Sequence, residues 1–158
     1  MWQRMLQGGS GGESKGEYSP ALVPKKSSSD TSGVISKGTP YSNNELDWKA
    51  FDRDAKTAWQ TMSQSDKYIG YKFDGKVCVT EVYVNTYSQT GYGMGNTTLK
   101  GYYQGSEIVS IPIDMTSIPH NTLTTYEVSN NKYCDEYRLY VTNANTILWE
   151  LQFGGYIK

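Results

Sequence analysis

The feature that most constrains the fold of this chain is a series of short strand-like runs with no amphipathic helix between them. The runs are rich in Val, Ile, Tyr and Thr, and Gly, Asn, Asp and Pro lie between them, which is typical of antiparallel strands and turns. They cover residues 68–73, 77–84, 98–103, 107–113, 124–128, 136–142 and 146–154. Because a parallel α/β fold needs crossover helices, the pattern predicts an all-β fold, an antiparallel sandwich or barrel.

Three details of these runs give local predictions. Asp74-Gly75 predicts a hairpin turn between the first two runs. The apolar parity shifts between Val79 and Val82, which predicts a bulge near residues 80–81. The last run is predicted to be a regular two-faced strand, with Ile147, Trp149, Leu151 and Phe153 alternating against Leu148, Glu150 and Gln152.

The distribution of aromatic residues divides the chain in two. Residues 1–40 are rich in Gly and Ser and contain few aromatic residues, so they cannot bury enough apolar surface to offset their ordering entropy. We expect a flexible N-terminal arm or anchor there, which orders on a partner through apolar residues such as Trp2. Residues 41–158 carry most of the aromatic residues and are predicted to form one β-sandwich.

Composition excludes several classes of function. A formal net charge of −1 argues against a nucleic-acid binder, and no apolar run is long enough for membrane insertion. One His and two Cys leave little for metal-hydrolase or thiol–His chemistry, so we expect no enzyme. Cys78 and Cys134 either pair or stay free, and synthesis in a reducing compartment favours free buried thiols.

The first residues, 1–7, have no apolar core or small-residue cleavage site, so we expect no signal peptide. The composition is nevertheless that of domains usually found outside cells. Two readings reconcile these observations. One is a virion protein that is made in a host cytoplasm and released by lysis; the other is a cytosolic domain with a disordered leader.

The densest polar cluster is Asp52-Arg53-Asp54, with Thr57 three residues further on. Carboxylate and hydroxyl oxygens in one tight loop suit a hard cation such as calcium. The alternative is a turn in which Asp52 and Asp54 cap backbone amides. Carboxylates two residues apart cannot easily face each other across a sugar, which argues against a glycosidase pair.

Loop aromatic residues are the best candidates for ligand contact. Tyr87 and Tyr92 lie in the predicted loop 86–96, and His120 follows Pro119 in another loop. Exposed aromatic rings on sandwich loops can stack against sugar rings, and we add Trp48 as a further contact. The alternatives are incidental tyrosines on a Gly-rich loop and a solvated histidine. A nucleotide loop is rejected, because a strand and not a helix follows residues 91–96.

Residues 50–59 resemble the A-F-D-x-D-x-x-T-x-W signature of discoidin domains, also called coagulation factor 5/8 type C domains, of the galactose-binding-like superfamily. Residues 68–76, 137–141 and 149–154 resemble later elements of the family, in the same order. The resemblance covers about residues 44–157. It implies a jelly-roll sandwich that recognises carbohydrate, lipid headgroups or protein rather than performing catalysis.

The same resemblance implies a structural calcium ion. Mapped onto this chain, the family's ligands are Asp52, Asp54, Thr57, Glu150 and the carbonyl of Ala50. Glu150 lies opposite Trp149 and Leu151 on the predicted strand, so it can leave the core and reach the loop. The flanking disulfide and the Arg-rich sugar contacts of some family members have no counterpart in this sequence.

Residues 6–12 also resemble the N-termini of bacteriophage tail and fibre proteins. Together these features predict a non-catalytic virion module. Its arm, residues 1–40, binds other virion proteins, and its domain recognises host-surface carbohydrate. A homo-oligomer or multi-copy array would raise a weak single-site affinity by avidity. The alternative is a purely structural virion decoration or adaptor protein that uses the same fold for protein–protein contacts.

Overall fold

The computed structural model describes residues 16–62, 66–89, 92–143 and 145–158. Strands are the main secondary structure of this part of the chain, which confirms the predicted all-β class. The elements are β1 (Glu17–Ser19), β2 (Val34–Lys37), the 3-10 helix η2 (Asp47–Phe51), β3 (Trp59–Thr61), β4 (Lys67–Thr86), β5 (Gly95–Tyr103), β6 (Ser106–Met115), β7 (Thr124–Glu127), β8 (Cys134–Val141) and β9 (Thr146–Ile157). The described residues contain no helix that is long and apolar enough to cross a membrane.

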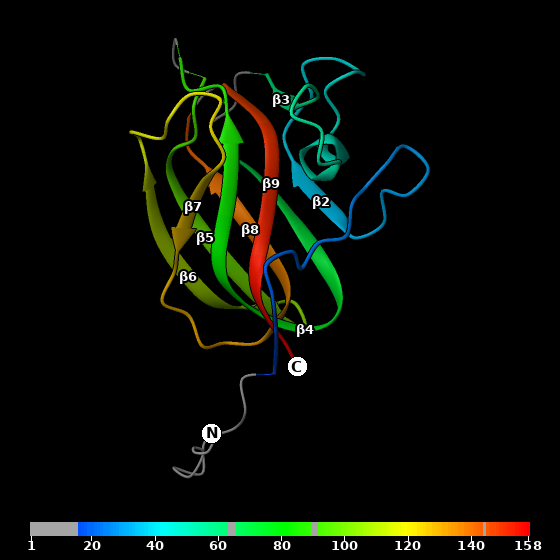
Figure 1. Cartoon of the computed structure of the whole chain (residues 1–158), viewed down its shortest axis with the longest axis vertical. Coiled ribbons are helices and arrows are strands. Elements are labelled where there is room, and N and C mark those ends of the chain that lie inside the picture. The colour runs from blue at the N-terminus through cyan, green and yellow to red at the C-terminus, as the bar shows by residue number, and fades with distance from the viewer. Residues whose placement is uncertain (1–15, 63–65, 90–91, 144) are drawn as a thin grey trace.

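Strand β4 organises the antiparallel sandwich. Its first half pairs with β2 and β8, and its second half pairs with β9 and β7. Strand β5 lies between β8 and β6, while β1 and β3 pair with β9. Figure 1 shows the resulting two layers, with β7, the end of β4 and β9 in front of β6, β5 and β8. The jelly-roll sandwich is therefore the observed fold.

The predicted hairpin at Asp74-Gly75 is wrong. The chain runs through these residues as one strand, and the register with β8 shifts between Lys72 and Val77. A Cβ added at Gly75 would have no heavy atom within 4 Å, so the bend lies in open space. Because the two halves of β4 pair with different neighbours, the strand crosses between the layers instead of turning back on itself.

The bulge predicted near residues 80–81 is confirmed. Val79 pairs with Gly155 and Glu81 pairs with Gly154, so Thr80 is an extra residue on β4. The bulge shifts the inward-facing parity of the strand, and Val79, Val82 and Val84 are all fully buried. The change of apolar parity in the sequence was therefore a true signal of this irregularity.

The predicted regular alternation of β9 is wrong. Asn85 pairs with Glu150 but Thr86 pairs with Leu148, so Trp149 is an extra residue on β9. Leu148 and Leu151 are both buried, and a bulge is needed to turn two residues three apart toward the same core. Trp149 is consequently only half-buried and lies outside the core.

The prediction of a flexible arm over residues 1–40 is wrong for residues 16–40, which belong to the sandwich. Strand β1 pairs with β9, strand β2 pairs with β4, and Val23 is fully buried in the core. Backbone pairing along existing sheet edges supplies the stabilisation that the sparse apolar side chains of this segment cannot supply alone. Residues 1–15 lie outside the described part of the chain, as do the apolar anchor residues predicted there.

The core between the layers is aromatic and aliphatic. Its largest fully buried hydrophobic side chains include Trp59, Ile69, Leu99, Tyr137 and Phe153. The buried Tyr137 hydroxyl donates to the Lys132 carbonyl at 2.8 Å, and burial raises the pKa of this phenol. Cys78 and Cys134 are both buried thiols and are not joined by a disulfide, the form that the sequence favoured.

Candidate functional site

Four half-buried side chains from three parts of the chain meet in one aromatic cluster, defined as Tyr87, Tyr92, His120 and Trp149. Tyr87 follows the end of β4, and Tyr92 lies in the same loop before β5. His120 lies in the loop between β6 and β7, and Trp149 is the bulge residue of β9. Three of the four predicted ligand contacts are thus brought together by the fold.

Tyr87 is the centre of the cluster. Its ring centroid lies 6.0 Å from Tyr92, 4.7 Å from His120 and 5.9 Å from Trp149, with near-perpendicular edge contacts in each case. His120 and Trp149 also contact each other at 5.9 Å. Such T-shaped pairs are stabilising beyond the burial of their area, so the rings hold one another in place.

Backbone hydrogen bonds fix the loop that carries the two tyrosines. The Tyr87 amide donates to the Ile147 carbonyl at 3.1 Å, and the Ile147 amide donates to the Tyr92 carbonyl at 3.3 Å. The base of this loop is therefore tied to β9 immediately beside the bulge. The tyrosines are held by the sheet and not only by their own loop.

His120 connects the second loop to the first. Its Nδ1 accepts a hydrogen bond from the Ser88 amide at 3.3 Å, and the neighbouring Asn121 amide donates to the Thr86 carbonyl at 3.0 Å. With Nδ1 acting as the acceptor, the proton of the neutral imidazole is on Nε2. The ring can thus offer an N–H donor to a ligand while it orders the loop.

Trp149 also lines a groove of about 420 Å³ that continues away from the other three rings. Its other walls are polar and aliphatic and include Lys49, Lys56, Gln60 and Ile147. Volumes of this order are typical of small-molecule sites. The Trp149 indole therefore belongs both to the aromatic cluster and to the wall of this groove.

The fourth predicted contact, Trp48, lies elsewhere. It belongs to η2, and the ammonium of Lys49 lies 5.6 Å from its ring centroid. The aromatic contacts of the structure do not place it with Tyr87, Tyr92 or His120. Trp149 is the cluster member that sequence reasoning missed, and the available signal was the pair Leu148 and Leu151, whose spacing breaks strict alternation.

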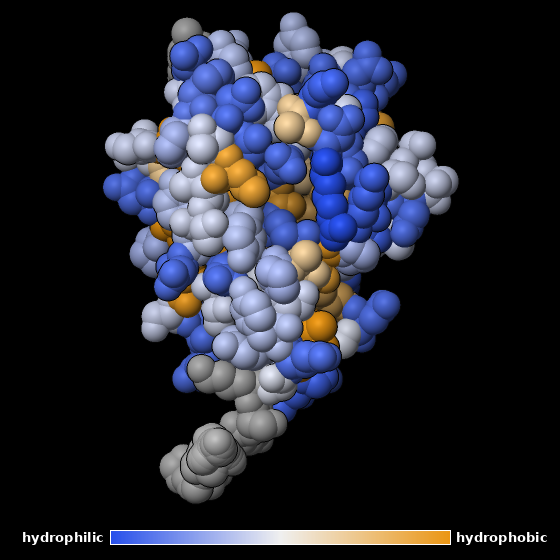
Figure 2. Space-filling view, in the orientation of Figure 1, coloured by the Kyte–Doolittle hydropathy of each residue, from blue (hydrophilic) through white to orange (hydrophobic). Residues whose placement is uncertain are grey.

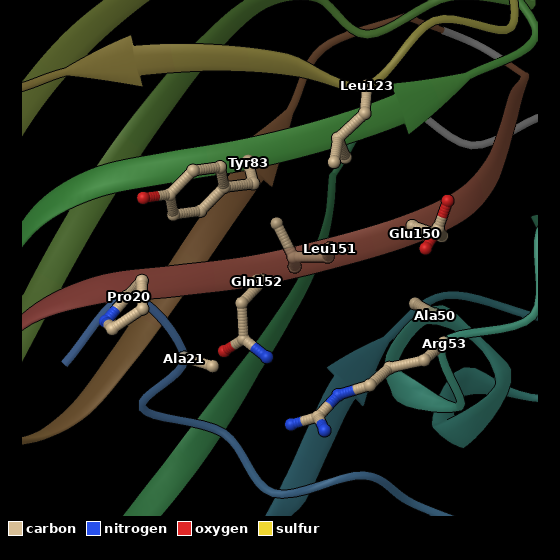
Figure 3. A pocket seen from close by; sticks show the side chains of 9 residues that line it. All are labelled: Pro20, Ala21, Ala50, Arg53, Tyr83, Leu123, Glu150, Leu151 and Gln152. Carbon is tan, nitrogen blue, oxygen red and sulfur yellow. The ribbon is translucent and has the colours of Figure 1, made fainter.

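A second hollow, the Arg53–Glu150 pocket, has a volume of about 380 Å³. It is lined by Pro20, Ala21, Ala50, Arg53, Tyr83, Leu123, Glu150, Leu151 and Gln152. Figure 3 shows Tyr83 and Leu123 on one side of β9 and Ala50 and Arg53 on the other, with Leu151 between them. Partial burial, followed by hydrogen bonding to Glu81, raises the pKa of the Tyr83 phenol, so this wall of the pocket stays uncharged.

Three of the residues predicted to bind calcium, Asp52, Asp54 and Thr57, form hydrogen bonds within one turn. Asp52 is buried and accepts hydrogen bonds from the Asp54 amide at 2.9 Å and from the Thr57 hydroxyl. The Asp54 carboxylate accepts from the Lys56 amide at 2.9 Å. Both carboxylates therefore cap backbone amides of their own turn, which is the alternative that the sequence left open.

The remaining two predicted ligands, Ala50 and Glu150, line the Arg53–Glu150 pocket, and the Glu150 carboxylate accepts a hydrogen bond from the Asn85 amide group at 3.3 Å. Among the described residues, no three His, Cys, Asp or Glu side chains converge on one point in a way that suits a metal ion. Calcium stays a prediction.

No protein-family model and no curated protein matches the chain. Solved structures do match its fold. An F5/8 type C domain from Bacteroides fragilis has a TM-score of 0.64 at 15% identity, covering 78% of this chain and 90% of that one. A family 32 carbohydrate-binding module of NanJ from C. perfringens, in complex with galactose, has a TM-score of 0.59 at 11% identity, covering 77% and 93%.

A third similar structure is chitosan-binding module 2 of a chitosanase/glucanase from Paenibacillus sp. IK-5, in complex with chitotriose. Its TM-score is 0.60 at 15% identity, and the match covers 77% of this chain and 95% of that one. These identities establish the fold and nothing finer. The chain shares the jelly-roll fold of these structures, which are named as an F5/8 type C domain and as carbohydrate-binding modules.

Proposed function

We propose that this chain is a non-catalytic carbohydrate-binding module whose ligand contacts the aromatic cluster and the adjoining groove. The observation that carries the proposal is the convergence of Tyr87, Tyr92, His120 and Trp149 from three separate segments of the chain. Half-buried rings of this kind present apolar surface for the C–H face of a sugar. Tyrosine hydroxyls and the His120 Nε2–H add hydrogen bonds for its hydroxyl groups.

Binding without turnover fits the chemistry of the cluster. Hydrolysis of a glycosidic bond by the usual route needs two carboxyl groups on opposite sides of the scissile bond. The aromatic cluster contains no carboxylate, and Asp52 and Asp54 are engaged in capping their own turn. The similar structures named as carbohydrate-binding modules support the same choice.

The test is a glycan-array and whole-cell binding screen of the full chain in multivalent form, beside a Tyr92→Ala variant. We expect binding to one carbohydrate class, with a reduced signal for the variant, because Tyr92 lies at the edge of the cluster. Multivalent presentation is needed because single-site sugar affinity is expected to be weak. Absence of binding to every glycan and cell type would favour the structural alternative, a protein–protein contact module.

The biological setting is proposed from the sequence alone. The resemblance of residues 6–12 to phage tail and fibre proteins supports a virion protein that displays its sandwich toward host-surface glycans, with partners among other virion proteins. Immunogold labelling of purified particles with an antibody against the sandwich tests this setting. Labelling of particles supports it, and a signal confined to soluble fractions contradicts it.

A calcium ion is proposed from the family resemblance, with Asp52, Asp54, Thr57, Glu150 and the Ala50 carbonyl as its ligands. An ion that binds only the native state raises the unfolding midpoint, by an amount that grows with its free concentration. Thermal unfolding with and without a chelator should then differ by several degrees, and Asp52→Asn should remove the difference. Equal unfolding midpoints with and without the chelator would contradict calcium binding, and these carboxylates would then only cap the backbone amides of their turn.

A further inference from the structure

The Arg53–Glu150 pocket is separate from the aromatic cluster and shares no residue with it. The two sites meet at the bulge of β9, where Trp149 belongs to the aromatic cluster and the next residue, Glu150, lines the pocket. Figure 2 shows apolar atoms emerging over β4 and β9 within a largely hydrophilic face. A hollow of about 380 Å³ in this region is large enough for a small ligand.

The walls of the pocket are mainly aliphatic. Leu151 is buried beneath the hollow, while Leu123 is 55% exposed. Pro20 and Ala21 form the N-terminal wall, and the segment they belong to is held by the Leu22 amide, which donates to the Phe153 carbonyl at 2.8 Å. These walls are therefore attached to the sheet and can contact the apolar face of a ligand.

The Arg53 guanidinium and the Glu150 carboxylate both line the pocket but form no ion pair with each other. Arg53 Nη2 donates to the Val23 carbonyl at 3.1 Å, and the Arg53 backbone adopts a left-handed φ of 60°. Glu150 Oε2 accepts from Asn85, and the ion pairs of the described residues do not join Arg53 to Glu150. Each group keeps hydrogen-bonding capacity beyond these contacts.

The other polar groups of the pocket are already used. The Gln152 side chain accepts from the Val23 amide at 2.9 Å and donates to the Val23 carbonyl at 3.0 Å. The Tyr83 hydroxyl donates to Glu81 at 3.1 Å. Recognition in this pocket therefore depends on one guanidinium donor and one carboxylate acceptor over an aliphatic surface.

This combination selects an uncharged polyhydroxyl ligand. A ligand with a net charge is attracted by one of these groups and repelled by the other, so its charge gains little and is costly to desolvate, whereas a hydroxyl group can accept from Arg53 and donate to Glu150. A sugar ring also carries an apolar face for Leu123 and Leu151. We propose that the Arg53–Glu150 pocket is a second carbohydrate site, which binds an uncharged sugar ring.

The test is a ¹⁵N–¹H NMR titration of the full chain with D-galactose, D-glucose and N-acetyl-D-glucosamine as neutral probes. We expect saturable shifts of amides around the pocket, such as those of Ala21, Arg53 and Leu123, with at least one probe. These shifts should persist in a Trp149→Ala variant, so failure of the aromatic cluster to bind sugar would not remove them.

Arg53→Gly is the decisive variant, because glycine tolerates the left-handed backbone while the guanidinium is lost. We expect affinity at the pocket to fall about tenfold, the effect of losing one hydrogen bond to a charged group. Gln104→Gly is the matched control, since Gln104 has a left-handed φ of 51° and is an exposed residue outside the pocket. The control should leave the shifts unchanged.

Charged probes complete the test. D-Galacturonate and D-glucosamine should bind the pocket more weakly than the best neutral probe, since attraction to one of the two groups is offset by repulsion from the other and the charge must still be desolvated. Shifts that do not saturate with any neutral probe would overturn the proposal. Equal affinity in Arg53→Gly, or tighter binding of either charged probe, would overturn it as well.

Discussion

The aromatic cluster and the Arg53–Glu150 pocket are supplied by neighbouring residues of one strand, yet their chemistry differs. The cluster is made of four rings with no carboxylate, and its members hold one another through edge contacts. The pocket is aliphatic and has one cation and one anion at its walls. A single extra residue in β9 separates them, because the bulge turns Trp149 outward and lets Glu150 pair with Asn85. Bulges next to functional sites commonly re-aim side chains in this way.

The largest effect is expected from Trp149→Ala. This change removes the ring that joins the cluster to the groove, and loss of a central aromatic contact typically costs about 2 kcal/mol or more, roughly a 30-fold loss of affinity. The measurement is affinity for the best array ligand by isothermal titration calorimetry. Trp48→Ala is the matched control and should change affinity little, since Trp48 lies outside the cluster; equal losses in both variants would contradict this division.

Deletion of Trp149 is a second test of the difference between the aromatic cluster and the Arg53–Glu150 pocket. Without this residue the pairing of β9 with β4 becomes regular, and Leu148 and Leu151 still point into the core with Glu150 between them. We expect cooperative unfolding and pocket binding to persist while cluster binding is lost. Circular dichroism melting together with the NMR titration provides the measurement, and a deletion variant that binds the array ligand normally would show that the bulge has no role in recognition.

A smaller effect is expected from Tyr92→Ala. Tyr92 contacts only Tyr87 among the rings, so the variant removes one wall of the cluster and leaves Tyr87, His120 and Trp149 in contact. We expect about a fivefold loss of affinity, near 1 kcal/mol, and little change in the unfolding midpoint. An affinity loss as large as that of Trp149→Ala would mean that the loop, and not the β9 bulge, dominates binding.

The smallest effect is expected at His120, where two variants distinguish a residue that only orders the loop from one that also contacts the ligand. His120→Ala leaves the Ser88 amide without its acceptor, and we expect the free energy of unfolding to fall by about 1 kcal/mol. His120→Asn offers an oxygen near the position of Nδ1 and should recover most of that stability without restoring the ring. Full recovery of ligand affinity by the asparagine would show that His120 only positions the loop.

Much of the fold was predictable because strand patterning is a local property. The parity change between Val79 and Val82 revealed the bulge at Thr80, and the motif at residues 50–59 indicated the jelly-roll fold. The continuous course of β4 through Asp74-Gly75 was not predictable, because a local turn signal was overridden by the different pairing partners of the two halves of the strand. The packing of residues 16–40 was missed for a related reason, since their stabilisation comes from distant sheet edges.

The candidate site was predictable only in part. Loop position identified Tyr87, Tyr92 and His120, which the fold brings together. Their convergence on Trp149 depends on a bulge that is set by pairing with β4, and periodicity alone assigned that residue to the core. The Arg53–Glu150 pocket was out of reach, because its walls come from segments more than a hundred residues apart, from Pro20 to Gln152.

The most direct test of carbohydrate binding at the aromatic cluster follows the Trp149 indole. In a full chain labelled with ¹⁵N-tryptophan, titration with the best array ligand should shift the Trp149 indole N–H resonance along a saturable curve. The resonance of the fully buried Trp59 should move little. A ligand that saturates the protein while the Trp149 resonance stays in place would contradict the account and place recognition on another face.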